Sequence, residues 1–233
     1  MLRKWEDLPK EMQIPEVKPY YDILNEKRGS LIIKRIFDIV VSAILLIILS
    51  PVIILLSIAI KIDSKGPVFY RQERYTQYGR KFRIHKFRSM CDGADKKGSL
   101  VTVENDSRVT RVGKIVRKCR LDEISQLIDV FNGDMTFVGV RPEVKKYVDE
   151  YEKEWLATFL LPAGVTNLTC IYFKDEDEMI NGVENVDKEY VEKILPIKMK
   201  WNLEGIKKFS FLEDIKLMFM TFFAVCGKEY SER

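Results

Sequence analysis

The chain has 233 residues, enough for one globular domain with a sizeable core. It is 46% hydrophobic and 32% charged, which excludes collagen-like and disordered classes. The net charge of +4 does not by itself suggest an anionic partner. That total hides an asymmetry, because residues 65–120 carry 16 Lys/Arg and only 5 Asp/Glu, a local charge of +11. We therefore expect the middle of the chain to bind an anionic partner or substrate.

Several familiar kinds of site are absent from the sequence. The four cysteines are scattered, which is typical neither of a zinc site nor of a disulfide framework, so a reducing compartment is the simpler inference. There is no P-loop and no G-x-G-x-x-G turn, so a standard nucleotide-binding fold is unsupported. The single histidine, His85, lies in a basic segment with no evident partner, and a surface or packing role is expected for it.

Residues 39–60 form a run of 22 uncharged and nearly all apolar residues. As a straight helix it would be roughly 33 Å long, enough to cross a bilayer core of about 30 Å. Two features favour a re-entrant segment instead. Ser50-Pro51 at the centre predicts a break, and Ser50 is expected to supply a partner for the freed backbone groups. Cations flank both ends, as expected for a segment that returns to its side of entry. From the residues alone, the two topologies remain equally supported.

The segments that follow predict a small β-hairpin and a helix. Partial alternation at 68–74 and 82–88, joined by turn residues, favours the hairpin, with a basic loop as the alternative. Residues 92–107 are typical of an exposed loop. Apolar residues spaced as on one helix face then predict a helix that begins near Asp122 and ends at Asn132-Gly133.

The C-terminal half predicts two further helices. The first covers residues 143–159 and stops before Pro162. Residues 175–192 hold eight acids, most simply a solvated face. The second helix, over 211–225, carries a surplus of large apolar side chains. We expect it to pack on the core, with the membrane interface as the alternative.

The strongest candidate for chemistry is the Asp122-Glu123 pair. Residues 108–120, which directly precede this pair, hold six cations and no acid. The cations and a helix N-terminus both favour an ionised Asp122, which could attack phosphorus or carbon, while a neighbouring carboxylate could hold a divalent metal. The alternative is that the two acids merely complement the helix dipole.

Six motifs in this order resemble the bacterial sugar-transferase family, the small monotopic phosphoglycosyl transferases, over about residues 31–220. They are KRIFD (34–38), the apolar run with Ser50-Pro51, GPVFYRQER (66–74), FRIHKFRSM (82–90), RVTRVGKIVRKCRLDEISQL (108–127) and NGDMTFVGVRPE (132–143).

The resemblance implies a reaction and roles for named residues. Members transfer a sugar-1-phosphate from a UDP-sugar to polyprenyl phosphate and release UMP. Asp122 would be the nucleophile that forms a covalent phosphosugar intermediate, and Glu123 would help to hold Mg²⁺. The implied phosphate- or substrate-binding residues are Lys86, Arg88, Arg117 and Arg141.

The resemblance also implies an architecture. The expected fold class is α+β, predominantly helical with a small β-hairpin and a membrane-embedded re-entrant helix broken at Ser50 and Pro51. The expected divisions are an N-terminal cytoplasmic segment (1–30), the membrane segment (31–65) and a catalytic domain with interfacial helices (66–233). The site would lie at the cytoplasmic face of the bacterial inner membrane, in contact with membrane lipids.

The sequence departs from the family pattern at several positions. Ile124, Ser125 and Val140 replace the usual Leu, Pro and Pro, and the later R/K-P-G-[IV]-T motif is altered at 162–166. Lys174 stands where many members have Arg. Because the last two changes fall toward the presumed sugar side, the sugar is left open, as are polyprenol preference, pathway and homodimer formation.

Two other functions compete with catalysis. A non-catalytic membrane scaffold could use the basic stretch to bind anionic lipid headgroups. Nucleic-acid binding is disfavoured, because residues 39–60 tie that stretch to a bilayer and no recognisable nucleic-acid module is present.

Overall fold

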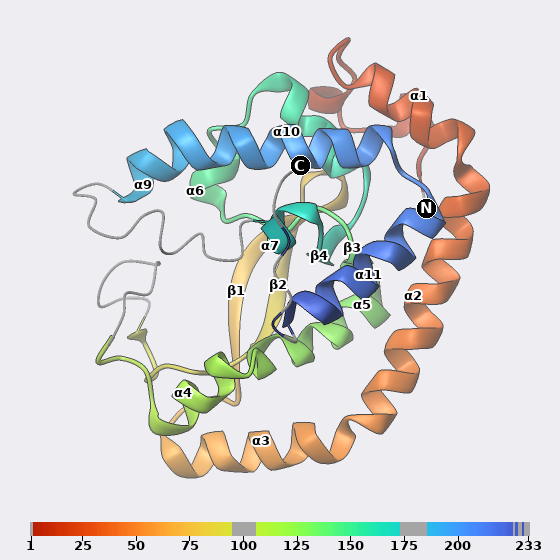
Figure 1. Ribbon diagram of the computed structural model, residues 1–233. Helices are drawn as coiled ribbons and strands as arrows, with labels where there is room; N and C mark the ends of the chain where they lie inside the picture. The colour runs from red at the N-terminus through yellow and green to blue at the C-terminus, as the bar shows by residue number, and fades with distance from the viewer. Residues whose placement is uncertain (1, 95–105, 173–185, 226, 228–229, 231–233) are drawn as a thin grey trace.

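The computed structural model describes residues 2–94, 106–172, 186–225, 227 and 230. Figure 1 shows helices surrounding two small sheets, which confirms a mostly helical α+β fold. The helices are α1 (Lys18–Glu26), α2 (Arg28–Ile48), α3 (Ser50–Asp63), α4 (Arg111–Lys118), α5 (Leu127–Asn132), α6 (Lys145–Val148), α7 (Leu168–Tyr172), α9 (Val186–Glu189), α10 (Leu195–Lys207) and α11 (Phe211–Val225). The strands are β1 (Phe69–Thr76), β2 (Arg80–Phe87), β3 (Met135–Val138) and β4 (Ala163–Thr166).

The predicted hairpin is confirmed. Strands β1 and β2 pair antiparallel, from Phe69 opposite Phe87 to Thr76 opposite Arg80. Phe82 and Ile84 are buried, as their alternation predicts.

A second, parallel pair, β3 and β4, was not predicted. Each strand has four residues, and β3 is buried along its whole length, so neither shows the alternation that marks a half-exposed strand. Gly139 follows β3 and packs directly on Gly164 of β4, where an added Cβ would lie 2.2 Å from the Gly139 nitrogen. Glycine is therefore required at this close approach.

The apolar run breaks where Ser50-Pro51 predicts. Helix α2 ends at Ile48, α3 begins at Ser50, and the axes are bent by 61°. Ser50 Oγ donates to the Ile47 carbonyl at 2.8 Å, so the serine satisfies a backbone group at the break. Neither helix alone has the length and apolarity to cross a bilayer, although the bent pair together does by length and composition. The 61° bend is compatible with either a broken span or a re-entrant segment, and α3 runs along the base of the molecule in Figure 1.

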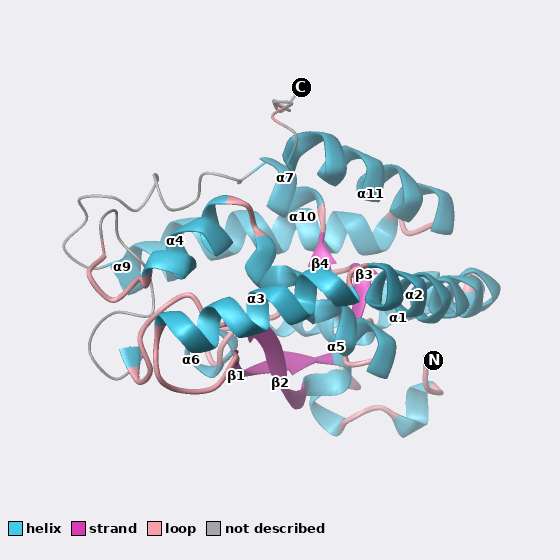
Figure 2. Cartoon of the chain, turned by 90° about the horizontal axis from the view of Figure 1, so that it is seen from below, coloured by secondary structure: helices cyan, strands magenta, loops and turns pink. Residues whose placement is uncertain are grey.

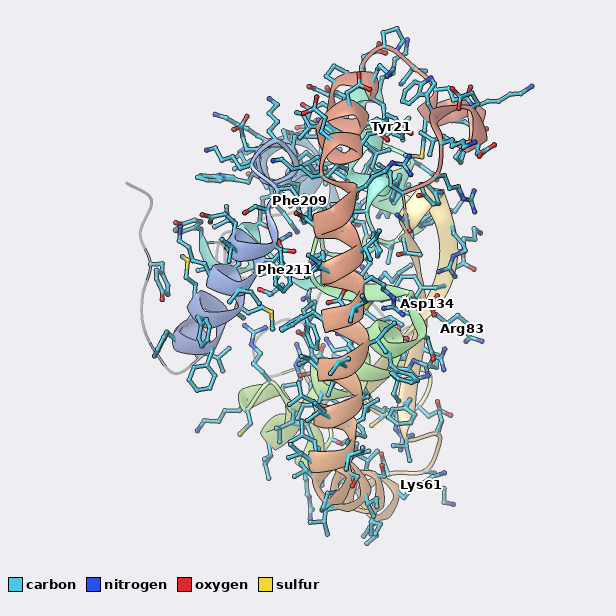
Figure 3. All side chains as sticks on the ribbon, turned by 90° about the vertical axis from the view of Figure 1, so that its right-hand side faces the viewer. Tyr21, Lys61, Arg83, Asp134, Phe209 and Phe211 are labelled. Atoms are coloured by element: carbon cyan, nitrogen blue, oxygen red, sulfur yellow. The ribbon has the colours of Figure 1, made fainter. Side chains whose placement is uncertain are left out.

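Helix α2 is tied to the rest of the chain by the KRIFD motif. Lys34 Nζ donates to the Val138 carbonyl at 2.8 Å and contacts Asp214 Oδ2 of α11 at 2.6 Å. Asp38 accepts from Thr136 Oγ1 at 2.7 Å. Arg35 donates to the last carbonyls of α5, at 2.7 and 2.9 Å. Figure 3 looks directly onto α2, which lies between α11 and the hairpin.

Two predicted helices differ from the observed ones. Residues 143–159 form α6 and a separate 3-10 helix, Lys153–Leu160, rather than one helix. Residues 157–160 are all buried, so this segment has no solvent-facing side and turns within the core. Asp122 lies in a 3-10 helix, Leu121–Gln126, and the α-helical geometry begins only at Leu127. The predicted end of that helix is confirmed, with Gly133 at φ 87° as its C-cap.

The largest core includes the N-terminal residues. Seven buried side chains before residue 26 pack with α10 and the 3-10 helix Lys153–Leu160. They are Leu2, Leu8, Met12, Val17, Tyr20, Tyr21 and Leu24. The proposed boundary between residues 30 and 31 falls inside α2, since that helix already begins at Arg28.

Helix α11 matches its predicted range, and its predicted core packing is confirmed for one face, where Leu217 and Met218 pack against the buried cluster around β3 and β4. The other face is exposed. Leu212 is 78% exposed, and Phe219 and Phe222 are each 62% exposed. Only Asp214 of this helix is buried, because it meets Lys34. Figure 2 shows α11 and α2 from below, and the two helices are in contact.

Some sequence expectations concern residues outside the described ranges. Residues 95–105 of the predicted loop are among them, and so are 173–185, which include Lys174 and much of the acidic stretch. Within its described part, Asp187 pairs with Lys146 at 2.6 Å.

Candidate active site

Asp122 and Glu123 lie in the first turn of the 3-10 helix Leu121–Gln126, against strand β2. Lys86, near the end of β2, approaches both carboxylates: its Nζ is 2.9 Å from Asp122 Oδ2 and 3.9 Å from Glu123 Oε1. Asp122 is 5% exposed. The hairpin and this short helix therefore bring together two acids and a cation that are 36 residues apart in the sequence.

Arg141 completes the cluster from the segment after β3. Its guanidinium donates to Glu123 Oε1. Burial alone would raise the pKa of the Glu123 carboxyl, but Arg141, and then Lys86 and Arg120, outweigh it and lower that pKa to about 2. In return, the Glu123 charge raises the pKa of Arg141. The pair is thus fully ionised near neutral pH.

The two residues that follow Arg141 are held by a buried network that the sequence did not predict. Glu143 accepts from the Tyr190 hydroxyl at 2.6 Å and from Lys198 Nζ at 3.3 Å. Arg74 of β1 donates to the Pro142 carbonyl at 3.0 Å. The V-R-P motif marks Arg141. Lys198 and Tyr190 belong to no motif, and their partner Glu143 is about 50 residues away in the sequence.

Arg88 makes its hydrogen bonds outside this cluster, and Arg117 acts on another acid, Asp106. Arg88 is buried and donates to carbonyls at the end of α3, including that of Ser64 at 2.8 Å. Arg117 lies on α4, where it adds to the dominant effect of Arg108 in lowering the pKa of the Asp106 carboxyl to about 2. Their phosphate-binding roles stay predictions.

His85 has a partner that its sequence context did not reveal. Its Nδ1 lies 2.6 Å from Asp129 Oδ1, and its backbone N–H donates to Asp129 Oδ2 at 2.8 Å. Asp129 is fully buried in α5. This pair fastens the hairpin to α5, directly behind the helix that carries Asp122, and so has the packing role that was expected.

The acids offer a limited donor set for a metal. The described residues contain no group of three His, Cys, Asp or Glu side chains that could hold an ion. Mg²⁺ is commonly held by one or two carboxylates together with substrate phosphates and water. Asp122 and Glu123 fit that pattern, but not a site built from protein ligands alone.

Comparison with known proteins places the chain in a family. The family model described as "Bacterial sugar transferase" matches residues 29–228, which include both acids, Lys86 and Arg141. The chain belongs to the bacterial sugar transferase family. The match confirms the resemblance carried by the six motifs.

Individual relatives of this sugar transferase have related names. A UDP-N-acetylgalactosamine-undecaprenyl-phosphate N-acetylgalactosaminephosphotransferase of Aeromonas hydrophila is 33% identical over 195 residues, covering 81% of this chain and 42% of that protein. A UDP-glucose:undecaprenyl-phosphate glucose-1-phosphate transferase of Escherichia coli K12 is 33% identical over 217 residues, covering 91% and 44%. An uncharacterized sugar transferase of Bacillus subtilis is 31% identical over 192 residues, covering 82% and 86%. The chain thus spans less than half the length of the first two relatives.

Proposed function

We propose that this sugar transferase is a membrane-bound phosphoglycosyl transferase. It moves a sugar-1-phosphate from a UDP-sugar to polyprenyl (undecaprenyl) phosphate, in the first membrane step of surface-glycan assembly. The observation that carries the proposal is the buried Asp122 carboxylate, held beside Glu123 and ringed by Lys86 and Arg141. The relatives' names supply the substrate class.

The reaction proceeds in two displacements at one phosphorus. An Asp122 oxygen attacks the phosphorus joined to the sugar, the bond from that phosphorus to the bridging oxygen breaks, and UMP leaves with the electron pair. An oxygen of polyprenyl phosphate then attacks the same phosphorus and breaks the aspartyl bond. The products are polyprenyl-diphosphate-sugar and regenerated Asp122.

The surrounding cations make attack by an anion on an anion feasible. The donor diphosphate repels the Asp122 carboxylate, and Lys86 and Arg141 offset this repulsion. Bound Mg²⁺ would neutralise further phosphate charge, with Glu123 as its protein ligand. Arg141 already keeps that carboxylate ionised.

The bent pair α2–α3 is the proposed membrane attachment, at the cytoplasmic face of the bacterial inner membrane. Both helices expose large apolar side chains, among them Ile47 at 74% and Leu55 at 66%. Cations lie beyond both ends of the apolar run. The second helix packs against α4, so insertion would hold the Asp122 cluster close to the bilayer surface, where a lipid phosphate lies.

The covalent mechanism is tested with purified protein in Mg²⁺, polyprenyl phosphate and a panel of UDP-sugars that includes UDP-GalNAc and UDP-glucose. Wild type should release UMP, and a donor radiolabelled in its sugar should label the protein when the lipid is omitted. Asp122→Asn should lose both signals, because its amide is not a nucleophile. Glu73→Gln, which removes an exposed carboxylate of β1, is the matched control and should keep both.

Undiminished turnover in Asp122→Asn would rule out the covalent mechanism. Wild type that binds anionic liposomes but turns over no donor would instead favour the scaffold.

The topology is tested by cysteine labelling in a background without native cysteines. Glu26→Cys and Lys65→Cys place thiols at exposed positions on either side of the bent pair. Gly66 is unsuitable, because its added Cβ would lie 2.1 Å from the Arg88 guanidinium. A re-entrant segment predicts that an impermeant reagent labels both sites from the cytoplasmic side, whereas a spanning helix would protect one.

A further inference from the structure

The residue two positions before Asp122 has an unusual backbone. Arg120 adopts φ 53° and ψ 26°, the left-handed region. Among the described residues, only Tyr78 is another non-glycine with positive φ. This conformation turns the chain from the end of α4 into the 3-10 helix that carries Asp122 and Glu123. Glycine or asparagine adopts it at lower cost than a long side chain does.

The Arg120 side chain is exposed and makes no hydrogen bond or ion pair with the part of the chain that the structure describes. Its charge nevertheless acts on Glu123, whose pKa it helps to lower after the larger effects of burial, Arg141 and Lys86. Those two cations contact the carboxylates directly. Arg120 therefore presents its donors at the edge of the cluster rather than to the acids.

A strained backbone beside a reactive group is a recognised mark of functional sites. Here the turn itself does not need arginine, so the backbone conformation does not account for this side chain. A guanidinium offers a planar pair of donors that matches two phosphate oxygens. Both substrates of the proposed reaction carry phosphate to the position of Asp122.

We propose that Arg120 binds a substrate phosphate at the entrance to the Asp122–Glu123 site and positions it for attack. The inference rests on the proposed function and adds a residue to its phosphate-binding set. The Arg120 side chain is exposed beside the turn, whereas Asp122 and Glu123 contact Lys86 and Arg141. The phosphate could belong to the donor diphosphate or to the lipid acceptor, and kinetics separates the two.

The test compares wild type with Arg120→Asn and Arg120→Lys in the UMP-release assay, varying the UDP-sugar and the polyprenyl phosphate separately. Asparagine keeps the left-handed turn but removes the cation. Loss of one charge-assisted phosphate contact should raise the KM for the substrate that Arg120 contacts by about 10- to 100-fold. The melting temperature of Arg120→Asn should equal or exceed that of wild type. Arg120→Lys should recover part of the loss.

Two further measurements separate binding from a structural role. The first is protein labelling without lipid. If Arg120→Asn needs a higher donor concentration for labelling, the contact is with the donor. If labelling is unchanged but the KM for polyprenyl phosphate is raised, the contact is with the acceptor. Lys114→Gln, which removes an exposed cation of α4, is the control and should leave both KM values unchanged.

The possible failures are distinguishable. Unchanged kinetics in Arg120→Asn, with wild type active, would overturn this inference and leave the proposed function standing. A loss of activity that tracks a lowered melting temperature would also overturn it, as a structural effect. Wild type that turns over none of the donors would overturn the proposed function, and this inference with it.

Discussion

At the scale of single residues, the charge state of Glu123 is decided by its neighbours. Burial opposes ionisation, yet Arg141, Lys86 and Arg120 together lower its pKa from 4.5 to about 2. Because the folded-state pKa is the lower one, the charged carboxylate stabilises the fold. That contribution is fully present above pH 4.5 and is lost as the pH falls toward 2.

Glu123→Gln should remove this dependence on pH. As the pH falls from 4.5 to 2, wild type should lose stability relative to the variant, by up to about 3 kcal/mol. Unfolding followed in detergent at a series of pH values measures the difference. Glu73→Gln, whose exposed carboxylate pairs with Lys81, should run parallel to wild type. If the stability of Glu123→Gln changed with pH in the same way as that of wild type, the lowered pKa of Glu123 would be contradicted.

At the scale of elements, buried polar contacts join α2 to distant parts of the chain. Lys34 and Asp214 are 5% and 8% exposed, and their contact joins α2 to α11. Such a pair contributes little net stability compared with apolar residues, but either partner left alone is a buried unpaired charge. The registry of the two helices therefore depends on both side chains being present.

A double-mutant cycle tests this coupling. Lys34→Met should lower the free energy of unfolding by about 3–5 kcal/mol, because Asp214 is then left buried without its cation. Adding Asp214→Leu should restore much of the loss. Thermal unfolding in detergent is measured for wild type, both single variants and the double variant. Additive losses in the double variant would show that the two charges are not coupled.

Local rules were enough for the elements whose signals lie in neighbouring residues. The hairpin followed from alternation, the α2–α3 break from Ser50-Pro51, and the end of α5 from Gly133. The Lys34–Asp214 contact could not be predicted, because the partners are 180 residues apart and each resembles an ordinary surface charge. The Arg120 turn was equally hidden, since arginine carries no turn signal. At the site, charge pattern singled out Asp122, while Lys86 and Arg141 entered only through motifs.

At the scale of the whole molecule, the N-terminal residues are part of the fold that supports the site. They precede the family match, which begins at residue 29, yet they pack with α10 and the 3-10 helix Lys153–Leu160. The Arg3 nitrogen donates to the Tyr78 hydroxyl at the hairpin tip at 2.8 Å. The segment thus braces the same hairpin whose other end carries Lys86.

Removing residues 1–17 should therefore unfold or strongly destabilise the protein, although the family-matched region stays intact. Leu2, Leu8, Met12 and Val17 are all buried, and each contributes about 1.5–3 kcal/mol by burial, a sum comparable to the total stability of a typical domain. Leu8→Ala is the milder variant and should cost about 2–5 kcal/mol, whereas Glu11→Ala, at an exposed position, should cost little. Melting temperature and trypsin resistance in detergent measure both. A truncated protein as stable as wild type would mean that the segment only covers the core, and that α10 and the hairpin hold their places without it.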